Sequence, residues 1–534
     1  LEHRRQRQMC IRDRGKGEPV TLITNQGFES LLEIRDQRRP DLFELAPAPR
    51  IPVIKDVIGI PGRLDRESRE LEKLELNSLE SLDASNVALA LINADTAPAH
   101  EKMMAEELRQ RGIEVSSSHE LAPLIRFWPR TETTVANAYL TPVMGAFIRE
   151  LCDTLPESPL SLMTSAGQLK GADEFRPIDS LLSGPAGGVA GALALARSVG
   201  LDQALTFDMG GTSTDVARIA GEAGYRHEQE IGPIRVLAPA VSIETVAAGG
   251  GSICQWRNDG LEVGPESAGS DPGPACYGRG GPLTITDVNL LLGLMDESKA
   301  GIPIDRQAAQ DRLDELTLEI GDHIDQEELL KGLRQIAIEH MAKALRQVST
   351  RDGYDCRDHT LIAFGGAGPQ HACALAEELG IRRILIPSDA GLLSAWGLHQ
   401  AGNRELRTKQ ILKPLDEFAK TFPSIIEELG KVGTIARCLH ELRLQGQDSC
   451  LEIETEPDCS FAELVTLFET RYRLLNGDAR PPGRKIEWVA ARVELIGESP
   501  EIPREQFDEG RLYEETSLEQ DAFSTMVTEA GWRK

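Results

Sequence analysis

The feature that most constrains the fold is the string Asp208–Asp215, which reads Asp-Met-Gly-Gly-Thr-Ser-Thr-Asp and ends an apolar run that begins at Ala204. The run Ala204–Asp208 is predicted to be a buried strand. A glycine turn of the P-loop or Rossmann type leads directly into a helix. Here the glycines are followed by Val216–Gly221, a short run that favours β-structure and ends in glycine. We therefore predict that the glycines form the tip of a β-hairpin.

The residue types in this tip suit the phosphates of a nucleotide. Glycine lets backbone N–H groups approach phosphate oxygens because no Cβ intervenes, and the neighbouring hydroxyls add donors. Asp208 is predicted to hold Mg²⁺ through water, and Asp215 to orient the loop or assist the metal; both are predicted catalytic residues. A tight turn without a ligand is the alternative. The predicted phosphate ligands are Gly210, Gly211, Thr212, Ser213 and Thr214.

Two further glycine clusters extend the predicted site. The turn Gly365–Pro369 follows the predicted strand Thr360–Phe364 and precedes a predicted helix, Gln370–Leu379. In actin-like, sugar-kinase and Hsp70-like ATPases, two hairpins hold the phosphates between two lobes, and such a turn packs against the adenosine. The tract Gly249–Gly251 is predicted either to form an anion-binding nest or to reverse the chain between domains. The predicted nucleotide ligands in these clusters are Gly249, Gly250, Gly251, Gly365, Gly366 and Gly368.

The order of predicted elements indicates several α/β domains, as the length of 534 residues requires. A strand at Val87–Ile92, a helix from Pro98 to Arg111 and a strand at Ile113–Val115 form a βαβ unit, which implies a parallel sheet. Further helices are predicted at 133–155, 189–199, 308–316 and 327–348, and the C-terminal part is predicted to hold a hairpin (439–444 and 450–453), a helix capped by Ser460 and Glu463, and a strand at 486–496. The predicted divisions are 1–14, 15–182, 183–406 and 407–534.

The net charge and the cysteines limit the possible partners. Acidic residues outnumber basic residues 85 to 58, which gives a formal charge of −27. Such a charge repels nucleic acid and anionic membranes, so neither is an expected partner. No apolar run approaches the ~20 residues that a membrane-spanning helix needs. The nine cysteines are scattered without a C-x-x-C pair, which is typical of the reducing cytoplasm.

The first fourteen residues differ from the rest of the chain. Leu1–Arg14 is densely basic, and Met9–Arg14 resembles the translation of a sequencing adapter. We predict that this segment is not native and exclude it from the reasoning about the fold. A disordered basic tail is the alternative.

Seven strings, taken in order, give the chain a specific resemblance. From Val20 to about Gly531 it resembles the hydantoinase A/5-oxoprolinase family. The strings are Ser183–Val189, Phe207–Asp215, Ala248–Ser252, Gly264–Gly269, Asp271–Tyr277, Thr286–Asn289 and Phe364–Pro369.

The resemblance implies an α/β, actin-like fold of the ribonuclease H-like, two-lobed kind, with an additional C-terminal α+β domain. It implies one D-x-G-G-T-type hairpin in each lobe. Only Asp208–Asp215 is present, so we expect the first hairpin to precede Gly15, and the C-terminal end to lack its last strand. We therefore expect the fragment to bind ATP poorly and to be inactive by itself. In this division 15–182 is the remainder of the N-terminal lobe, 183–406 the core ATPase lobe and 407–534 the C-terminal domain.

The implied activity is ATP-dependent ring opening of a lactam or cyclic imide, of the 5-oxoproline or hydantoin type, with Mg²⁺, a B-type partner subunit and an oligomeric assembly. Amide resonance deactivates the carbonyl of such a ring, and phosphorylation of its oxygen by ATP makes the carbon electrophilic. Positioning and charge neutralisation suffice for phosphoryl transfer, so no protein nucleophile is required. Two alternatives are the ATP-using subunit of an acetone- or acetophenone-type carboxylase, and a non-catalytic actin-like scaffold.

Two strings favour oxoprolinase-type members of the family, namely Gln370–Ala374 and Arg35–Phe43. The sequence departs from the family pattern at two places that bear on the substrate. Thr164–Gln168 stands where members often read Q-S-N-G-G, and Glu244 stands where many members carry His or Asn. Four residues stay open between structural and functional roles, and these are Cys276, His371, Asp271 and Asp287.

Overall fold

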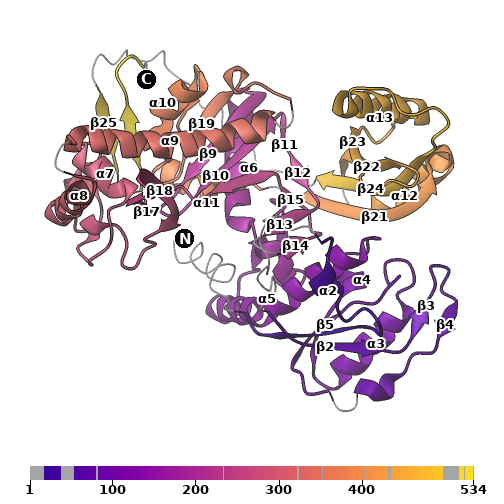
Figure 1. The fold of residues 1–534 in the computed structure, drawn as a ribbon. Coiled ribbons are helices and arrows are strands. Elements are labelled where there is room, and N and C mark those ends of the chain that lie inside the picture. The colour runs from indigo at the N-terminus through magenta and orange to yellow at the C-terminus, as the bar shows by residue number, and fades with distance from the viewer. Residues whose placement is uncertain are drawn as a thin grey trace.

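The structure is a computed structural model that describes residues 17–37, 53–79, 82–231, 234–321, 324–350, 353–401, 404–430, 434–496, 516–521 and 523–532. The segment 1–14, predicted to be non-native, and residues 38–43 of the string Arg35–Phe43 lie outside these ranges. Among the described residues, three sheets of four or six strands, each with its own helices, follow one another along the chain (Figure 1), and the other sheets have two strands each.

The N-terminal sheet is fully parallel. Its strands, in spatial order, are β2 (Ile54–Ile60), β1 (Val20–Asn25), β5 (Asn86–Leu89) and β6 (Glu114–Ser117). Alternate residues of β5 face opposite sides: Leu89 packs with α3 (Ala99–Gln110), whereas Ala88 packs with α5 (Phe127–Thr154). The predicted βαβ unit is confirmed.

The middle sheet contains the predicted hairpin. Its strands run in the order β11 (Glu222–Ala223), β10 (Thr214–Ala220), β9 (Gln203–Met209), β19 (Thr360–Phe364) and β20 (Ile384–Leu385), with β16 (Ile243–Val246) also paired to β10. β9 is antiparallel to β10 and parallel to β19. Helices α6 (Ser183–Ser198) and α11 (Leu393–Gln400) contribute to the core on one face, and α9 (Gln326–Thr350) and α10 (Gly368–Leu379) to the core on the other. This sheet is therefore a mixed sheet covered on both faces.

The start of α6 differs from the prediction. The helix was predicted over 189–199, whereas it begins six residues earlier, at Ser183, so the predicted start is wrong. The glycines serve a close crossing of α6 over α11, because a Cβ on Gly187 would lie 2.9 Å from the carbonyl oxygen of Ser394. A Cβ on Gly191 would lie 2.7 Å from the carbonyl oxygen of Leu393. Glycine in this segment therefore allows α6 to pack closely against α11.

The C-terminal sheet is antiparallel. Its strands, in spatial order, are β21 (Arg404–Pro414), β24 (Ile486–Ile496), β22 (Thr434–Leu444) and β23 (Leu451–Thr455). Its core packs side chains of α12 (Phe418–Leu429) and α13 (Phe461–Asn476) around Trp488. The predicted hairpin is confirmed, and so is the capping box: Glu463 N donates to Ser460 Oγ at 3.3 Å, and Ser460 N to Glu463 Oε2 at 2.8 Å.

The last two strands do not join that sheet. β25 (Ser517–Gln520) and β26 (Thr525–Thr528) pair with each other, and β26 lies against α10. Arg334 and Glu529 form an ion pair of 2.6 Å, and Trp532 Nε1 donates to Glu377 at 2.9 Å. The prediction grouped 407–534 together, whereas the structure places these strands with the middle sheet.

The remaining elements connect these parts. They are α2 (Leu31–Ile34), β3 (Arg63–Leu64), β4 (Glu70–Glu72), α4 (Ser118–Leu121), β7 (Ser161–Met163), β8 (Leu169–Gly171), β12 (Tyr225–Arg226), β13 (Gln229–Ile231), β14 (Ile234–Val236), β15 (Ala240–Val241), β17 (Ser252–Arg257), β18 (Gly260–Ser267), α7 (Ile285–Leu291) and α8 (Arg306–Ile320). Among the described residues, no helix combines the length and apolar character needed to cross a bilayer.

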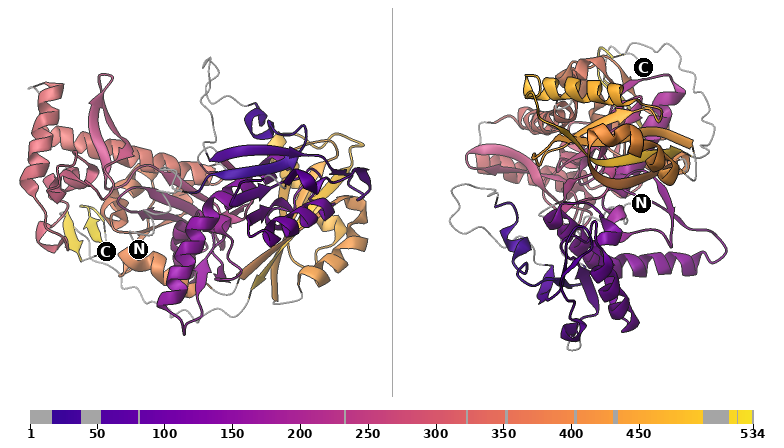
Figure 2. Two further views of the ribbon diagram at one scale, coloured as in Figure 1. Left: turned by 90° about the horizontal axis from the view of Figure 1, so that it is seen from below. Right: turned by 90° about the vertical axis from the view of Figure 1, so that its right-hand side faces the viewer.

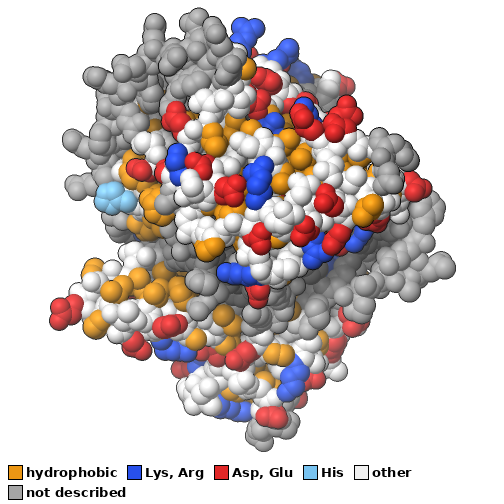
Figure 3. Space-filling model, turned by 90° about the vertical axis from the view of Figure 1, so that its left-hand side faces the viewer, with side chains coloured by type: hydrophobic (Ala, Val, Ile, Leu, Met, Phe, Trp, Pro, Cys, Tyr) orange, Lys and Arg blue, Asp and Glu red, His pale blue; other side chains and the backbone are white. Residues whose placement is uncertain are grey.

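The N-terminal and C-terminal sheets lie at one end of the molecule, and α7 and α8 lie at the other (Figure 1, Figure 2). A hydrogen bond of 2.9 Å from Gln410 Nε2 to Asp95 Oδ2 joins them, and buried Arg130 donates to the other oxygen of Asp95 at 2.8 Å. On the face shown in Figure 3, acidic and basic side chains are interspersed. A mixture of this kind is typical of a solvated surface.

Candidate functional site

The glycine tip lies where β9 turns into β10. Met209 pairs with Thr214 and Asp208 with Asp215 in an antiparallel register, and Gly210 N donates to the carbonyl oxygen of Ser213 at 3.1 Å. The prediction of a hairpin tip, as opposed to a helix N-terminus, is confirmed. A Cβ placed on Gly211 would meet no atom within 4 Å. The tip therefore faces open space, as a surface that receives a ligand must.

The two aspartates of the string face each other. Residues directly opposite in an antiparallel pair point to the same face of the sheet, with Cβ atoms roughly 4.5–5.5 Å apart. Asp208 is 2% exposed and its Oδ2 accepts a 3.2 Å hydrogen bond from Ser394 Oγ. Asp215 is 6% exposed and its Oδ1 accepts a 2.7 Å bond from Thr245 Oγ1. The strand register thus brings two buried carboxylates together below the tip.

This pair fits a Mg²⁺ ion. Mg²⁺ prefers oxygen ligands, keeps several waters and is usually bound through one or two carboxylates plus substrate phosphates. Within the described ranges no group of three or more His, Cys, Asp or Glu side chains is arranged to hold a metal. A site of two carboxylates, completed by water and phosphate, is consistent with that finding.

The turn Gly365–Gly366 lies against the same carboxylate. Gly365 has φ +83°, and a Cβ there would lie 2.5 Å from Asp208 Oδ1. Ala367 N donates to the carbonyl oxygen of Met209 at 3.0 Å. Gly368 begins α10, and a Cβ on it would lie 3.2 Å from the carbonyl oxygen of Phe207. Glycine is required here because the turn approaches the end of β9 so closely.

Two further contacts complete the surroundings of this site. A Cβ on Gly188 of α6 would lie 3.1 Å from Asp208 Oδ2, so α6 also reaches the carboxylate. On the other side, Thr525 N donates to the carbonyl oxygen of Gly366 at 3.4 Å, and a Cβ on Gly366 would lie 3.5 Å from that of Phe523. The C-terminal end of the chain therefore borders the predicted adenosine turn.

The tract Gly249–Gly251 supports the tip. Gly250 N donates to the carbonyl oxygen of Gly210 at 3.1 Å, and Gly251 N to that of Gly211 at 2.6 Å. Gly249 N donates to Ser252 Oγ at 2.8 Å, and a Cβ on Gly249 would lie 2.6 Å from the carbonyl carbon of Thr212. All three N–H groups are used within the chain. The tract therefore supports the backbone of the tip, a role that neither prediction named, and its role as a nucleotide ligand stays a prediction.

Cys276 and Asp287 belong to a buried cap near the start of α7. Asp287 is fully buried and accepts hydrogen bonds from Thr284 N, Ala275 N and Cys276 N at 2.7–3.1 Å. Burial raises the pKa of the fully buried Cys276 thiol far above its usual range, and the charge of Asp287 adds to the effect. A thiol in that state is a poor nucleophile. Both residues have structural roles.

His371 is buried at the start of α10. Burial lowers its pKa to about 3, so the imidazole is neutral. Its Nε2 lies 3.1 Å from Asn289 Nδ2, which also donates to Gln370 Oε1 at 3.0 Å. His371 therefore packs inside the molecule. The fourth open residue, Asp271, is exposed.

The two sequence departures also have defined surroundings. Arg226 Nη2 donates to Glu244 Oε1 at 2.6 Å. Within Thr164–Gln168, Ser165 N and Oγ both donate to the carbonyl oxygen of Asp179, at 2.6 and 2.8 Å. Both contacts hold the local backbone, and neither reaches the hairpin tip.

Sequence reasoning missed three hydroxyl residues at this site. Ser394 and Thr245 contact the carboxylates, and Thr286 donates from N and Oγ1 to the carbonyl oxygen of Gly250, at 2.7 and 2.8 Å. Thr286 lies in one of the recognised strings and could have been selected from it. Ser394 and Thr245 carry no local sequence signal.

The fold and the site define a mixed α/β protein with a two-carboxylate glycine hairpin, and comparison with known proteins identifies its family. The Hydantoinase/oxoprolinase family profile matches residues 130–407, and the profile of the Hydantoinase/oxoprolinase N-terminal region matches residues 11–112. The chain belongs to the hydantoinase/oxoprolinase family.

The relatives include proteins named as a 5-oxoprolinase and as a caprolactamase subunit. A 5-oxoprolinase of Saccharomyces cerevisiae is 34% identical over 73% of this chain and 34% of its own length. The caprolactamase subunit alpha of Pseudomonas jessenii is 35% identical over 71% of this chain and 58% of its own. An uncharacterised protein of Methanocaldococcus jannaschii is 33% identical over 90% of this chain and 77% of its own length. The chain spans less than half the length of the curated 5-oxoprolinases that it matches.

Two crystal structures share the fold. The ATP-dependent caprolactamase of Pseudomonas jessenii matches with a TM-score of 0.81 and 26% identity, over 97% of this chain and 87% of that one. A nucleotide-free acetone carboxylase matches with a TM-score of 0.75 over 98% and 87% of the two chains, but its 20% identity supports the fold alone.

Proposed function

We propose that this chain forms the ATP-using part of an enzyme that opens a lactam or cyclic imide, of the 5-oxoproline or hydantoin type. The observation that carries the proposal is the facing pair Asp208 and Asp215 below an open glycine tip, with the Gly365 turn against the same carboxylate. Phosphate donors, a divalent-ion site and a candidate adenosine surface lie together there. The relatives named as a caprolactamase and 5-oxoprolinases support the substrate class.

The proposed fold is actin-like. The antiparallel pair β9 and β10, extended by β16 and followed by the parallel strands β19 and β20, is the arrangement expected for a ribonuclease H-like lobe. In such folds a second lobe supplies another phosphate hairpin. We propose that full nucleotide affinity requires that second hairpin in addition to Asp208–Asp215.

In the proposed reaction, the lactam carbonyl oxygen attacks the γ-phosphorus of ATP, the bond to the ADP oxygen breaks, and an activated ring results. A first water then adds to the ring carbon and the C–N bond breaks, which leaves an acyl phosphate with a free amine. A second water hydrolyses the acyl phosphate, and an amino acid and phosphate leave. Asp208 and Asp215 would hold Mg²⁺, which neutralises phosphate charge when bound. Backbone N–H groups and hydroxyls of Gly211–Thr214 would orient the γ-phosphate. Ser394 and Thr245 hold the two carboxylates in position.

We propose a B-type partner subunit as well, because one relative is named as the alpha subunit of a caprolactamase. A cytoplasmic location suits the free thiols of the eight described cysteines.

The test is ADP release from Mg-ATP by this chain combined with a B-type partner subunit, with and without a preceding segment that supplies a second phosphate hairpin. Separate reactions contain 5-oxoproline, caprolactam, a hydantoin, or acetone with bicarbonate, with a reaction lacking any of them as the control. We expect stimulation by one of the cyclic amides, with an equivalent amount of ring-opened amino acid.

Two results would contradict the proposal. Stimulation only by acetone with bicarbonate would indicate a carboxylase. Tight ATP binding without turnover in every reaction would indicate a nucleotide-binding scaffold.

A further inference from the structure

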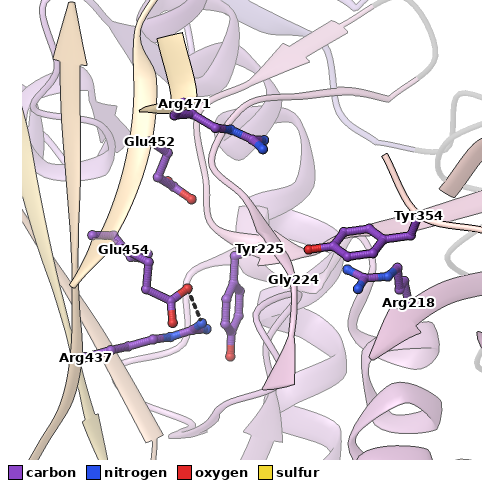
Figure 4. Close-up of a pocket in the computed structure, with 9 residues that line it drawn as sticks. Arg218, Gly224, Tyr225, Tyr354, Arg437, Glu452, Glu454 and Arg471 are labelled. Atoms are coloured by element: carbon purple, nitrogen blue, oxygen red, sulfur yellow. Dashed lines mark hydrogen bonds and ion pairs between the residues drawn. The ribbon is translucent and has the colours of Figure 1, made fainter. Parts of the chain in front are cut away.

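A pocket separate from the hairpin tip lies between the middle sheet and the C-terminal sheet (Figure 4). Its volume is about 260 Å³. One wall is formed by Arg218 of β10, Tyr225 of β12 and Tyr354, which follows α9. The other is formed by residues of β22, β23 and α13. The pocket thus joins parts of the chain that are distant in sequence: Arg218 and Tyr225 lie more than 200 residues before Arg437, and Tyr354 lies 83 residues before it.

Arg218 carries a charge whose hydrogen-bond partners are neutral. Its Nε donates to His359 Nε2 at 3.1 Å and its Nη2 to Gln203 Oε1 at 3.0 Å, and its Cζ lies 3.3 Å from the centroid of the Tyr354 ring. His359 Nδ1 lies 2.8 Å from the carbonyl oxygen of Asp355, so Nδ1 donates and Nε2 accepts. Burial lowers the pKa of His359, and the charge of Arg218 adds to this, which is consistent with a neutral ring. The Arg218 guanidinium retains donors for an anion.

The opposite wall brings a second arginine with an uncommitted charge. Arg471 lies on an exposed face of α13, and within the described residues it has no ion pair or hydrogen bond through its side chain. Figure 4 shows its guanidinium extending toward the wall that holds Tyr354 and Arg218. Arg437, in contrast, is bound to Glu454 at 2.9 Å and to Glu494 at 2.5 Å. Two arginines ready for an anion are unexpected in a chain of net charge −27.

Two carboxylates line the same pocket. Glu454 is 56% exposed and accepts from one nitrogen of Arg437, which leaves acceptor capacity on its oxygens. Glu452 lies 3.0 Å from His227 and 3.3 Å from Arg492. Sites for an anion and for an ammonium group therefore lie within one small cavity, beside the rings of Tyr225 and Tyr354.

We propose that this pocket binds a free amino acid, with its carboxylate on Arg218 and Arg471 and its ammonium group on Glu454 and Glu452. The volume of about 260 Å³ lies below the roughly 300–1,000 Å³ of pockets for drug-sized ligands, so it suits a small metabolite. A ring-opened lactam is an amino acid. The inference that the bound amino acid is the reaction product rests on the proposed function. The inference that the pocket binds an amino acid does not.

The pocket lies beside elements that lead to the hairpin, so a ligand bound there is connected to the candidate ATP site through the backbone. Arg218 and Asp215 lie on the same strand, three residues apart, which corresponds to roughly 10 Å at 3.4 Å per residue. Tyr354 and His359 precede β19, the strand that leads to Gly365. A ligand that joins the two walls would therefore contact β10 and the segment that precedes β19, and we expect it to affect nucleotide affinity.

The test is isothermal titration of the full chain with L-glutamate and with 6-aminohexanoate, and with acetate and inorganic phosphate as controls. We expect one of the two amino acids to bind with a 1:1 stoichiometry and the controls not to bind. Arg471→Glu should weaken that binding at least about tenfold, because a charge-assisted hydrogen bond is replaced by repulsion. Arg473→Glu, an exposed position on the same helix that does not line the pocket, should leave binding unchanged.

Three results would overturn the proposal: no binding of either amino acid to the unaltered chain, equal binding of acetate or phosphate, or equal weakening by Arg473→Glu. Arg218→Gln, checked for folding by its thermal transition, should also abolish binding, and retained affinity in a folded variant would count against it. Binding is measured without ATP turnover. Failure of ADP release in every lactam reaction would therefore reject the proposed function and leave the pocket unaffected.

Discussion

Two hairpins in this molecule each bring two carboxylates face to face, and they stabilise these groups differently. In the middle sheet, Asp208 opposes Asp215, and the hydroxyls of Ser394 and Thr245 bind to them. In the C-terminal sheet, Glu441 opposes Glu452, and the buried guanidinium of Arg492 donates to both, at 2.5 and 3.3 Å.

The two pairs differ in the charge of their partners, and we propose that this difference reflects a structural role for the C-terminal pair and a metal-binding role for Asp208 and Asp215. The guanidinium of Arg492 compensates the charge of the C-terminal pair, so that pair stabilises the fold, and Glu452 also lines the pocket described above. Hydroxyls position a carboxylate without carrying a charge, which suits a pair that receives a divalent ion. The glycine turns beside the two pairs differ in how crowded they are. A Cβ on Gly365 would collide with Asp208, whereas one on Gly446, in the turn between β22 and β23, would meet nothing within 4 Å.

The largest expected effect is on catalysis. Asp208→Asn should reduce Mg-ATP-dependent ADP release on the order of 10²–10³-fold, as the loss of one electrostatic group at a transition state does, without lowering thermal stability. Asp202→Asn, an exposed carboxylate just before β9, is the matched control and should retain full activity. Equal losses of activity in both variants would show that Asp208 has no special role, and the proposed functional difference between the two carboxylate pairs would then be wrong.

The C-terminal pair should respond in the opposite way. Arg492→Met should lower the free energy of unfolding by about 3–5 kcal/mol, because it leaves Glu441 and Glu452 without their shared cation. Arg484→Met, at an exposed position before β24, should change it by less than about 0.5 kcal/mol. Urea unfolding followed by circular dichroism measures both, and a stable Arg492→Met variant would contradict a structural role for this pair.

The C-terminal core should also lose stability in acid. Burial against Phe418, Phe422 and Trp488 lowers the pKa of His440 to about 4, from an ordinary value near 6.5. Between these two values the unfolded chain binds a proton that the folded chain excludes, so stability falls as the pH falls from about 6.5 to 4. The contribution is about 3 kcal/mol.

His440→Gln should flatten the pH dependence of the unfolding free energy in this window. His340→Gln, at an exposed position on α9, should leave it unchanged. An unchanged slope in His440→Gln would show that other groups cause the acid sensitivity.

The smallest effects compare the two glycines. Gly365→Ala combines a positive φ with a Cβ 2.5 Å from Asp208 Oδ1, so we expect a loss of about 2 kcal/mol of stability and weaker nucleotide binding. Gly446→Ala has a similar φ of +86° but open space, so only the backbone cost of about 1 kcal/mol is expected. Calorimetric unfolding with and without Mg-ATP measures both, and equal losses would show that crowding at Asp208 is not important.

The sequence predicted elements well where the signal is local. The run Ala204–Asp208 and the β-favouring residues after the glycines predicted the hairpin, and apolar periodicity predicted the long helix observed at Gln326–Thr350. Predictions failed where a glycine serves a distant contact. Ser183–Gly188 has the composition of a turn, yet it is helical because α11 crosses it closely.

What the sequence by itself determined is the hairpin, its two opposed aspartates and the family, because strand alternation and glycine tips depend on neighbouring residues. Only the tertiary structure decided which groups meet at Asp208: Ser394 is 186 positions away, and the tract Gly249–Gly251 uses its N–H groups to hold the tip. It also decided the pocket between Arg218 and Arg471. Such contacts depend on how separate sheets and helices pack, and packing is set by the shapes of many residues together, so no short segment of sequence encodes it.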